Sequence, residues 1–213
     1  MVLKTYDTTG KKAVVTKQLT PKSFAKFGDI ISADHQIGLK EQSSANYGTA
    51  VKVHKVAKVI NNSSNAKSGV KAQANWNIFR CSPPNHLFQK NSDGNIVYLS
   101  KVLERHPYST QTFLPMGVDK EKDAYIVICA KSRKGIIEDS LPDPDTLEAF
   151  ICKGNQAVTY GAGTWHAPMV SLVDNLDFGV LIHENGIADE DCQECYFEPG
   201  YNVVIKSHLS SKL

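Results

Sequence analysis

The fold is indicated first by the stretch KVLERHPYSTQTFLPMG, residues 101–117. It divides into two runs of β-branched and aromatic residues around the turn-forming pair at 107–108. Successive side chains of a strand point to opposite faces, so the first run places Glu104 and His106 on one face. Gln111 joins that face from the second run. The stretch therefore predicts two strands whose polar side chains converge on one side.

A second stretch, YGAGTWHAPM at residues 160–169, complements the first. Gly161 and Gly163 favour a tight turn, and His166 follows on a strand. Together the two stretches resemble the cupin pattern, in which two inward histidines one residue apart precede a glutamate five positions on and a later Gly-x-x-His. Those positions are filled here by Glu104, His106, Gln111 and His166. These four side chains are therefore predicted to converge inside a small β-barrel.

The ligand positions depart from the cupin pattern in two places. Glu104 replaces a histidine and Gln111 replaces the glutamate. A neutral amide is a poor ligand for a hard cation, whereas imidazole suits several divalent transition metals. The cofactor is therefore left open between no metal and a divalent metal, nickel or zinc. The ligands of such a metal would be His106, His166, Glu104 and Gln111.

Most of the remaining chain is typical of strands. Runs of β-branched and aromatic residues fall at 76–80, 96–99, 102–106, 110–114, 125–130, 149–152, 157–160, 165–171, 178–183 and 202–205. A short helix is predicted at 20–27, because Thr20 offers an N-cap and Gly28 a stop. Residues 33–75 are polar and are predicted as part loop or insertion, with an exposed loop at 61–74. We therefore predict a mainly β protein, a cupin-like antiparallel β-barrel of jelly-roll type with a few short helices, in one domain over 1–213.

Composition excludes several classes of protein. The 213 residues include 24 Lys and Arg and 22 Asp and Glu, a net charge of +2 without the basic excess of nucleic-acid-binding domains. There is no apolar run long enough for a membrane span, and the N-terminus lacks the apolar segment of a signal peptide. The five cysteines are therefore expected to be reduced inside a cell.

The last residues predict a location. Ser211, Lys212 and Leu213 form the tripeptide that a peroxisomal import receptor reads, and residues 207–213 are expected to be an exposed tail. The predicted location is therefore the peroxisome, or otherwise the cytoplasm.

Three weaker motifs give little support for a binding site. The dinucleotide-binding fingerprint that begins at Gly161 fails, because His166 occupies its third glycine position. Cys192 and Cys195 form one Cys-x-x-Cys pair, whereas a structural zinc site needs a second pair. The basic segment 52–58 lacks the interleaved aromatic residues of a nucleic-acid surface and fits a solvated strand face.

Further motifs are spread over most of the chain. They are LTPKSFAKFGDII at 19–31, NIFR at 77–80, VLERHP at 102–107, STQTF at 109–113, PMG at 115–117, GNQAVTY at 154–160 and GTWHAP at 163–168. Together they resemble the ureidoglycolate lyase family, formerly called ureidoglycolate hydrolase, of the fungal and bacterial type. The resemblance implies a cupin-like barrel, usually a homodimer, that splits (S)-ureidoglycolate into glyoxylate and urea. In that family the reaction is a late step in the use of purine nitrogen through allantoin.

The substrate implied by the resemblance suggests roles for the four converging residues. Its cleavage needs a base for the hydroxyl proton and an acid or polarisation at the leaving nitrogen. His166 and His106 would be the acid–base pair or the ligands of a polarising metal. Glu104 would orient a histidine or act as the base, and Gln111 would hydrogen-bond the substrate or hold its ureido oxygen.

Three further residues are predicted to contact the substrate. Arg80 is the candidate clamp for the carboxylate, because a planar guanidinium matches a carboxylate. Lys101 is the alternative clamp. Tyr160 would close the pocket or only pack.

Other functions stay open at this stage. A ureidoglycolate hydrolase would release ammonia from the same substrate in place of urea. A non-catalytic cupin that binds a small acid would also tolerate Glu104 and Gln111 in ligand positions. An interaction module is the weakest alternative, since it leaves the inward polar set without a use.

Overall fold

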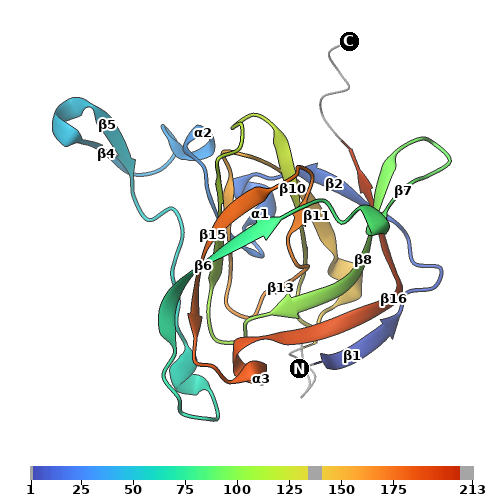
Figure 1. Ribbon diagram of the computed structural model, residues 1–213. Helices are drawn as coiled ribbons and strands as arrows, with labels where there is room; N and C mark the ends of the chain where they lie inside the picture. The colour runs from blue at the N-terminus through green and yellow to red at the C-terminus, as the bar shows by residue number, and fades with distance from the viewer. Residues whose placement is uncertain (1, 134–140, 207–213) are drawn as a thin grey trace.

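The computed structural model describes residues 2–133 and 141–206, and its larger sheet closes into a barrel (Figure 1). Strands β8, β13, β10, β11, β2 and β16 follow one another in hydrogen-bonded order, and β16 pairs with β8 to complete the ring. Strands β1, β7 and β14 add to its borders. The nine strands are β1 (Val2–Asp7), β2 (Val14–Gln18), β7 (Phe88–Lys90), β8 (Ile96–Arg105), β10 (Asp123–Ala130), β11 (Glu148–Lys153), β13 (Trp165–His166), β14 (Val170–Ser171) and β16 (Gln193–Ile205).

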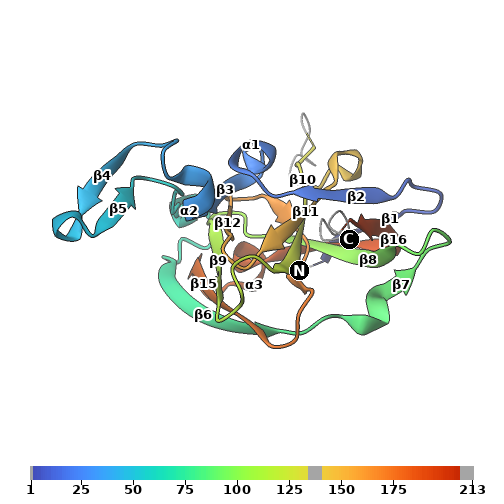
Figure 2. The same cartoon turned by 90° about the horizontal axis from the view of Figure 1, so that it is seen from above.

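A second sheet of five strands packs beside the barrel (Figure 2). Its order is β3, β12, β9, β15, β6, so that β6 lies at an edge. The strands are β3 (Gly28–Ile31), β6 (Gln73–Cys81), β9 (Gln111–Met116), β12 (Ala157–Tyr160) and β15 (Leu176–Glu184). β8 and β9 are consecutive in the chain but belong to different sheets, so the turn between them carries the chain from one sheet to the other.

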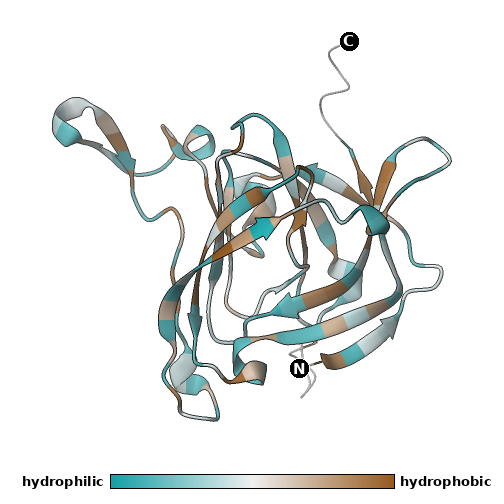
Figure 3. Cartoon of the chain, viewed as in Figure 1, coloured by the Kyte–Doolittle hydropathy of each residue, from teal (hydrophilic) through white to brown (hydrophobic). Residues whose placement is uncertain are grey.

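Strand β10 lies between two hydrophobic cores. Ile126 and Ile128 point into the closed barrel, whereas Tyr125, Val127 and Cys129 point into the space between the two sheets. Because both of its faces are covered, the strand is an almost continuous apolar run. Other strands alternate between apolar and polar residues along their length (Figure 3).

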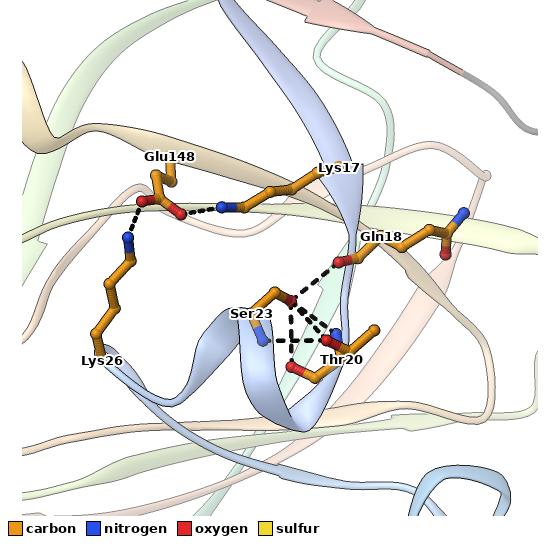
Figure 4. Close-up of polar contacts among 6 residues, drawn as sticks. All are labelled: Lys17, Gln18, Thr20, Ser23, Lys26 and Glu148. Atoms are coloured by element: carbon orange, nitrogen blue, oxygen red, sulfur yellow. Dashed lines mark hydrogen bonds and ion pairs between the residues drawn. The ribbon is translucent and has the colours of Figure 1, made fainter.

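The first helix closes one side of the second core. Helix α1 (Pro21–Phe24) begins with a capping box, in which the Thr20 hydroxyl accepts from the Ser23 backbone N–H and Ser23 accepts from the Thr20 N–H. Beside the helix, the Glu148 carboxylate forms ion pairs with Lys17 and Lys26 (Figure 4). Phe24 is fully buried in the second core. The helix predicted at 20–27 is therefore present but shorter.

The polar segment 33–75 contains more structure than predicted. Helix α2 (Ala33–Gln36) precedes a hairpin of β4 (Gln42–Ala45) and β5 (Ala50–Val53), closed by a 3₁₀ turn at Asn46–Gly48, that extends away from the barrel (Figure 1). The chain then returns to the body of the protein. Within the predicted exposed loop at 61–74, Ser63 and Ala66 are buried, a 3₁₀ turn forms at Ser63–Asn65 and β6 has already begun.

Residues 60–72, which we call the return segment, fasten the turn between β8 and β9. The Asn62 N–H donates to the Tyr108 carbonyl at 2.7 Å, and the Thr110 N–H donates to the Ile60 carbonyl at 3.2 Å. Most residues of the predicted exposed loop at 61–74 are exposed, but backbone hydrogen bonds fasten its start to the turn.

The predicted fold class, a mainly β cupin-like barrel with few short helices, is confirmed. The runs at 96–99 and 102–106 belong to one strand, and the run at 165–171 is two short strands. Sequence patterns missed β1 to β4 and β7, which are short or lie outside the apolar runs, and the strand face predicted at 52–58 overlaps only the end of β5. The remaining helical turns are Asn85–Leu87, Pro144–Thr146 and α3 (Ala188–Asp191). Within the described ranges, no helix is long and apolar enough to cross a membrane.

Candidate active site

One row of residues crosses the barrel on the side that faces the second sheet. His166 on β13 is the register partner of Cys129 on β10 and of Glu104 on β8, and Glu104 is in turn the partner of Glu194 on β16. Directly paired residues of neighbouring antiparallel strands point to the same face. Since Cys129 belongs to the core between the sheets, His166 and Glu104 point there too.

A second row faces it from the five-stranded sheet. Gln111 on β9 pairs with Tyr160 on β12 and with Ile182 on β15, and Ile182 pairs with Asn75 on β6. The Gln111 Oε1 lies 3.1 Å from the His166 Nε2, which joins the two sheets at this point. The Tyr160 ring stacks on the His166 imidazole with 3.9 Å between ring centroids.

The structure brings all four converging residues together. The Glu104 Oε1 lies 3.7 Å from the His166 Nε2, and the imidazoles of His106 and His166 are 5.5 Å apart between centroids. One candidate ligand atom from each of Glu104, His106 and His166 lies within 4.8 Å of the others. The spacing of a metal site is therefore present in this cluster, which we call the interior cluster together with Gln111.

Backbone carbonyls orient both histidines. The Nδ1 of His106 lies 2.6 Å from the Asp191 carbonyl oxygen, and the Nδ1 of His166 lies 2.9 Å from that of Thr164. A carbonyl oxygen only accepts, so each Nδ1 carries the proton and donates it. In the neutral rings each Nε2 therefore presents its lone pair to the cluster, as second-shell carbonyls arrange for metal-binding histidines.

The glycine turn predicted at 161–163 holds this arrangement. The Gly163 N–H donates to the His106 carbonyl at 2.8 Å, and Gly163 adopts a positive φ of 75° that favours glycine. The turn thus ties the backbone of His106 to the segment that leads into β13, three residues before His166.

Burial dominates the electrostatics of the cluster. It lowers the pKa of His166 to about 3, with the neighbouring His106 adding to the shift, and it also lowers the pKa of His106. Burial and the nearby Glu194 raise the pKa of Glu104 to about 7. The charged groups that act most on these three side chains are the acids Glu194, Glu184 and Asp191 and the imidazole of His106.

The cluster has the character of a cation site. The His106 Nε2 is buried and has no hydrogen-bond partner among the described residues. When His166 is neutral, its Nε2 and the Gln111 Oε1 that faces it are both acceptors, so either the amide turns to donate its NH₂ or a cation lies between them. Buried acceptors without donors are costly. The residues present therefore fit a divalent cation.

A thiol borders this cluster. The Cys192 Sγ lies 4.0 Å from the Glu104 Oε2. Burial, with Glu104 and Glu194 nearby, raises the pKa of Cys192 to about 11, so the thiol stays protonated and can donate to the carboxylate. Cys195 is buried in the barrel core, and none of the five cysteines, all within the described residues, forms a disulfide bond.

The two predicted carboxylate clamps lie away from the cluster. Arg80 is exposed at the other end of β6 and makes a two-pronged pair with Asp177, with 2.8 Å in each contact. Lys101 is exposed on β8, opposite an irregularity in β16. The structure therefore does not bring either cation to the cluster. A hollow of about 640 Å³ beside Ile96, at the far end of β8, contains none of the predicted site residues.

Tyr160 contacts the interior cluster only through its ring, which stacks on the His166 imidazole. Its hydroxyl is fully buried and has no hydrogen-bond partner among the described residues. The groups that act most on its pKa, which burial raises, are Cys129, Tyr125 and Cys152 of the second core. Of the two predicted roles, the geometry therefore favours packing.

Sequence reasoning missed three polar residues beside Gln111. Asn75 and Asn77 on β6 donate from their side-chain amides to the Glu184 Oε2 on β15, at 3.2 and 3.4 Å. The alternation of Asn75, Trp76, Asn77 and Ile78 does mark a strand, but such a pattern normally places the apolar side chains inward. In β6 the asparagines point inward and the apolar side chains point outward, because β6 is an edge strand whose outer face is apolar.

Comparison with known proteins agrees with the motifs. The sequence model described as ureidoglycolate lyase matches residues 11–204. A ureidoglycolate lyase of Saccharomyces cerevisiae is 45% identical over 202 residues, covering 90% of this chain and 98% of that protein. The chain belongs to the ureidoglycolate lyase family.

Other members of the ureidoglycolate lyase family are more distant. A ureidoglycolate lyase of Schizosaccharomyces pombe is 36% identical over 195 residues, covering 92% of this chain and 97% of that protein. One of Brucella anthropi is 30% identical over 186 residues, covering 87% of this chain and 90% of its own. The range matched by the family model, residues 11–204, therefore contains the positions of the interior cluster.

Proposed function

We infer that this protein is a ureidoglycolate lyase, a carbon–nitrogen lyase that converts ureidoglycolate to glyoxylate and urea. Family membership supports the activity. The convergence of Glu104, His106, His166 and Gln111 between the two sheets supports the proposal that the reaction takes place there. The (S) preference and the role in allantoin and purine breakdown are proposals that rest on the family resemblance.

The cluster would hold a divalent cation through Glu104, His106 and His166, and nickel and zinc are the candidates because imidazole suits both. When bound, such an ion would hold the substrate carboxylate and polarise the adjacent hydroxyl. The acids Glu184, Glu194 and Asp191, which act on these residues, support this assignment. The ion would supply the positive charge that the distant Arg80 and Lys101 do not.

The reaction moves one proton within the substrate. The hydroxyl proton leaves, and the electron pair of the O–H bond forms the aldehyde carbonyl. The carbon–nitrogen bond breaks, its electron pair stays on the urea nitrogen, and that nitrogen gains a proton. We propose that Glu104 carries this proton, because it is the most solvent-accessible of the three titratable members, with a side chain 22% exposed against 2% for His166. Both histidines already donate Nδ1 protons to carbonyls and keep fixed orientations. Gln111 would hydrogen-bond the substrate.

A product assay tests the activity. The protein is incubated with racemic ureidoglycolate, with and without a chelator, and glyoxylate, urea and ammonia are measured separately. Equal amounts of glyoxylate and urea are expected. Ammonia in place of urea would indicate the hydrolase, and saturable binding without turnover, even with metal restored, would indicate a non-catalytic cupin.

Variants test the assignment of the site. His106→Ala and His166→Ala should each lower kcat/KM by at least about 100-fold, since each removes a member of a unit that acts together. Rates within a few-fold of the parent in both variants would contradict the assignment. Loss of activity with chelator, and its return with nickel or zinc, would identify the histidines as metal ligands.

We propose that the protein is a homodimer. The outer face of β6 and β9 exposes Trp76, Ile78, Leu114 and Met116, with exposed fractions of 64, 77, 42 and 41%. An unpaired edge strand with an apolar face favours contact with a second copy. Light scattering of the parent and of Ile78→Lys tests the assembly, and an unchanged mass in the variant would exclude this face.

Peroxisomal delivery stays a prediction. The tripeptide Ser211, Lys212 and Leu213, which the import receptor would read, lies outside the described residues. A fluorescent fusion with and without these three residues, compared in the same cells, tests it. Diffuse signal from both forms would exclude the peroxisome.

A further inference from the structure

The inner face of β6 and β15 carries three polar residues that have no role in the proposed proton transfer. Asn77 pairs with Val180 and Asn75 with Ile182, so both asparagines share the inward face of those apolar residues. Glu184 follows Ile182 by two residues and therefore points the same way. We call Asn75, Asn77 and Glu184 the edge group.

The edge group adjoins the interior cluster. Ile182 is the partner of both Asn75 and Gln111, so only one residue separates the asparagine from the glutamine across the sheet. Glu184 lies about 7 Å beyond Ile182 along the strand, and its charge acts on His106. A single small molecule in contact with Gln111 can therefore also reach this group.

The edge group has hydrogen-bonding capacity left for a ligand. Within the described part of the chain, the Glu184 Oε2 accepts both asparagine amides through long contacts, and its Oε1 accepts none. Glu184 is only half-buried and Asn75 is exposed, so solvent can be exchanged for a ligand. The aromatic pair Phe79 and Phe113 lies farther along the same face, with Phe79 43% exposed.

The chemistry of the group matches one end of the substrate. A ureido group offers N–H donors and one carbonyl acceptor, whereas the other end of ureidoglycolate is a carboxylate. A carboxylate side chain accepts two N–H groups at once and repels a second carboxylate. Asparagine amides can donate to the ureido carbonyl.

We propose that Glu184, with Asn75 and Asn77, binds the terminal ureido group of the substrate and fixes its orientation. This inference rests on the proposed function. The carboxylate end then points to the interior cluster and the ureido end to the edge of the sheet. The edge group thus determines specificity and is separate from the proton-carrying residues.

Two unreactive analogues test the proposal. N-carbamoylglycine has the substrate skeleton without the hydroxyl, and N-acetylglycine replaces its terminal NH₂ with a methyl group. Their inhibition constants against ureidoglycolate turnover are measured for the parent, Glu184→Gln and Asp177→Asn. Asp177 lies on the same strand but on its outer face, paired with Arg80, so it is the matched control.

The parent should bind N-carbamoylglycine about 10- to 100-fold more tightly than N-acetylglycine, the range for hydrogen bonds to a charged group. Glu184→Gln should reduce this ratio to within a few-fold, and Asp177→Asn should keep it. Equal inhibition of the parent by both analogues, or an unchanged ratio in Glu184→Gln, would overturn the proposal while turnover to urea continues. Failure of the proposed function shows separately, as a parent that forms no urea.

A second variant keeps the test independent of folding. Asn77→Ala leaves the charge of Glu184 in place and removes one donor, so KM should rise several-fold while kcat changes little. Circular dichroism and thermal unfolding check that each variant is folded. A fall in kcat at constant KM would instead assign Asn77 to the chemical step and contradict the proposal.

Discussion

The substitution Tyr160→Phe separates packing from substrate contact at the interior cluster. It keeps the ring that stacks on His166 and removes a buried hydroxyl that has no partner within the described residues. An unpaired buried hydroxyl costs about 1–3 kcal/mol. The small void left by one oxygen costs about 0.3 kcal/mol, at roughly 24 cal/mol per Å³.

The variant should therefore be more stable by about 1–2 kcal/mol, which corresponds to a rise in Tm of about 2–8 °C for a chain of this size. Lyase activity should be unchanged. Unfolding is followed in guanidinium chloride by fluorescence of the two tryptophans, because urea is a product of the reaction. Kinetics are measured on the same preparations.

Tyr125→Phe is the matched control, since the Tyr125 hydroxyl donates to the Gln156 carbonyl in the same core. The identical chemical change should there cost about 1–2 kcal/mol, because it leaves a buried acceptor unpaired. A Tyr160→Phe variant that loses stability would show that the Tyr160 hydroxyl has a partner. A loss of tenfold or more in kcat/KM would show that the hydroxyl takes part in the reaction.

Three other predictions follow from the described contacts. Burial raises the pKa of Tyr98 from 10.0 to about 12, so its contribution to stability is complete below pH 10 and is lost as pH rises to 12. Between pH 10 and pH 12 the free energy of unfolding of the parent should therefore fall by up to about 2.7 kcal/mol more than that of Tyr98→Phe. Unfolding measured at a series of alkaline pH values would show this difference. Gly28→Ala would place a Cβ 2.0 Å from the Thr159 carbonyl oxygen and should cost at least about 1–3 kcal/mol by thermal unfolding, whereas a stable variant would mean that β3 can shift. Arg80→Ala should keep the KM for ureidoglycolate, and a large rise would restore Arg80 as a carboxylate clamp.

Much of the site was predictable because strand parity is a local property. The alternation of Glu104 and His106, and the spacing to Gln111, follow from the pleat of β8 and β9 and from one turn. The placement of His166 opposite Glu104 required the cupin resemblance, because β13 has only two residues and no pattern of its own.

The errors concern which face of an element is covered. Arg80 follows an apolar run and suggests a clamp, yet it lies on the outer face of an edge strand, where Asp177 satisfies it. Parity within β6 is readable, but the choice between its two faces depends on neighbours far away in the sequence. Residues 61–74 are mostly exposed, as predicted, but the sequence gives no sign that Asn61 pairs with Ser109 in the turn between β8 and β9.

Strand β6 has an apolar outer face and an inner face that carries two asparagines. If the outer face forms the proposed dimer contact and the inner face binds the substrate as proposed, assembly and catalysis would be thermodynamically linked through a single strand, because a contact that orders one face lowers the entropy lost when the other face is occupied. Apparent substrate affinity should consequently depend on protein concentration near the dissociation constant of the dimer. Dilution itself would then adjust the activity of the enzyme.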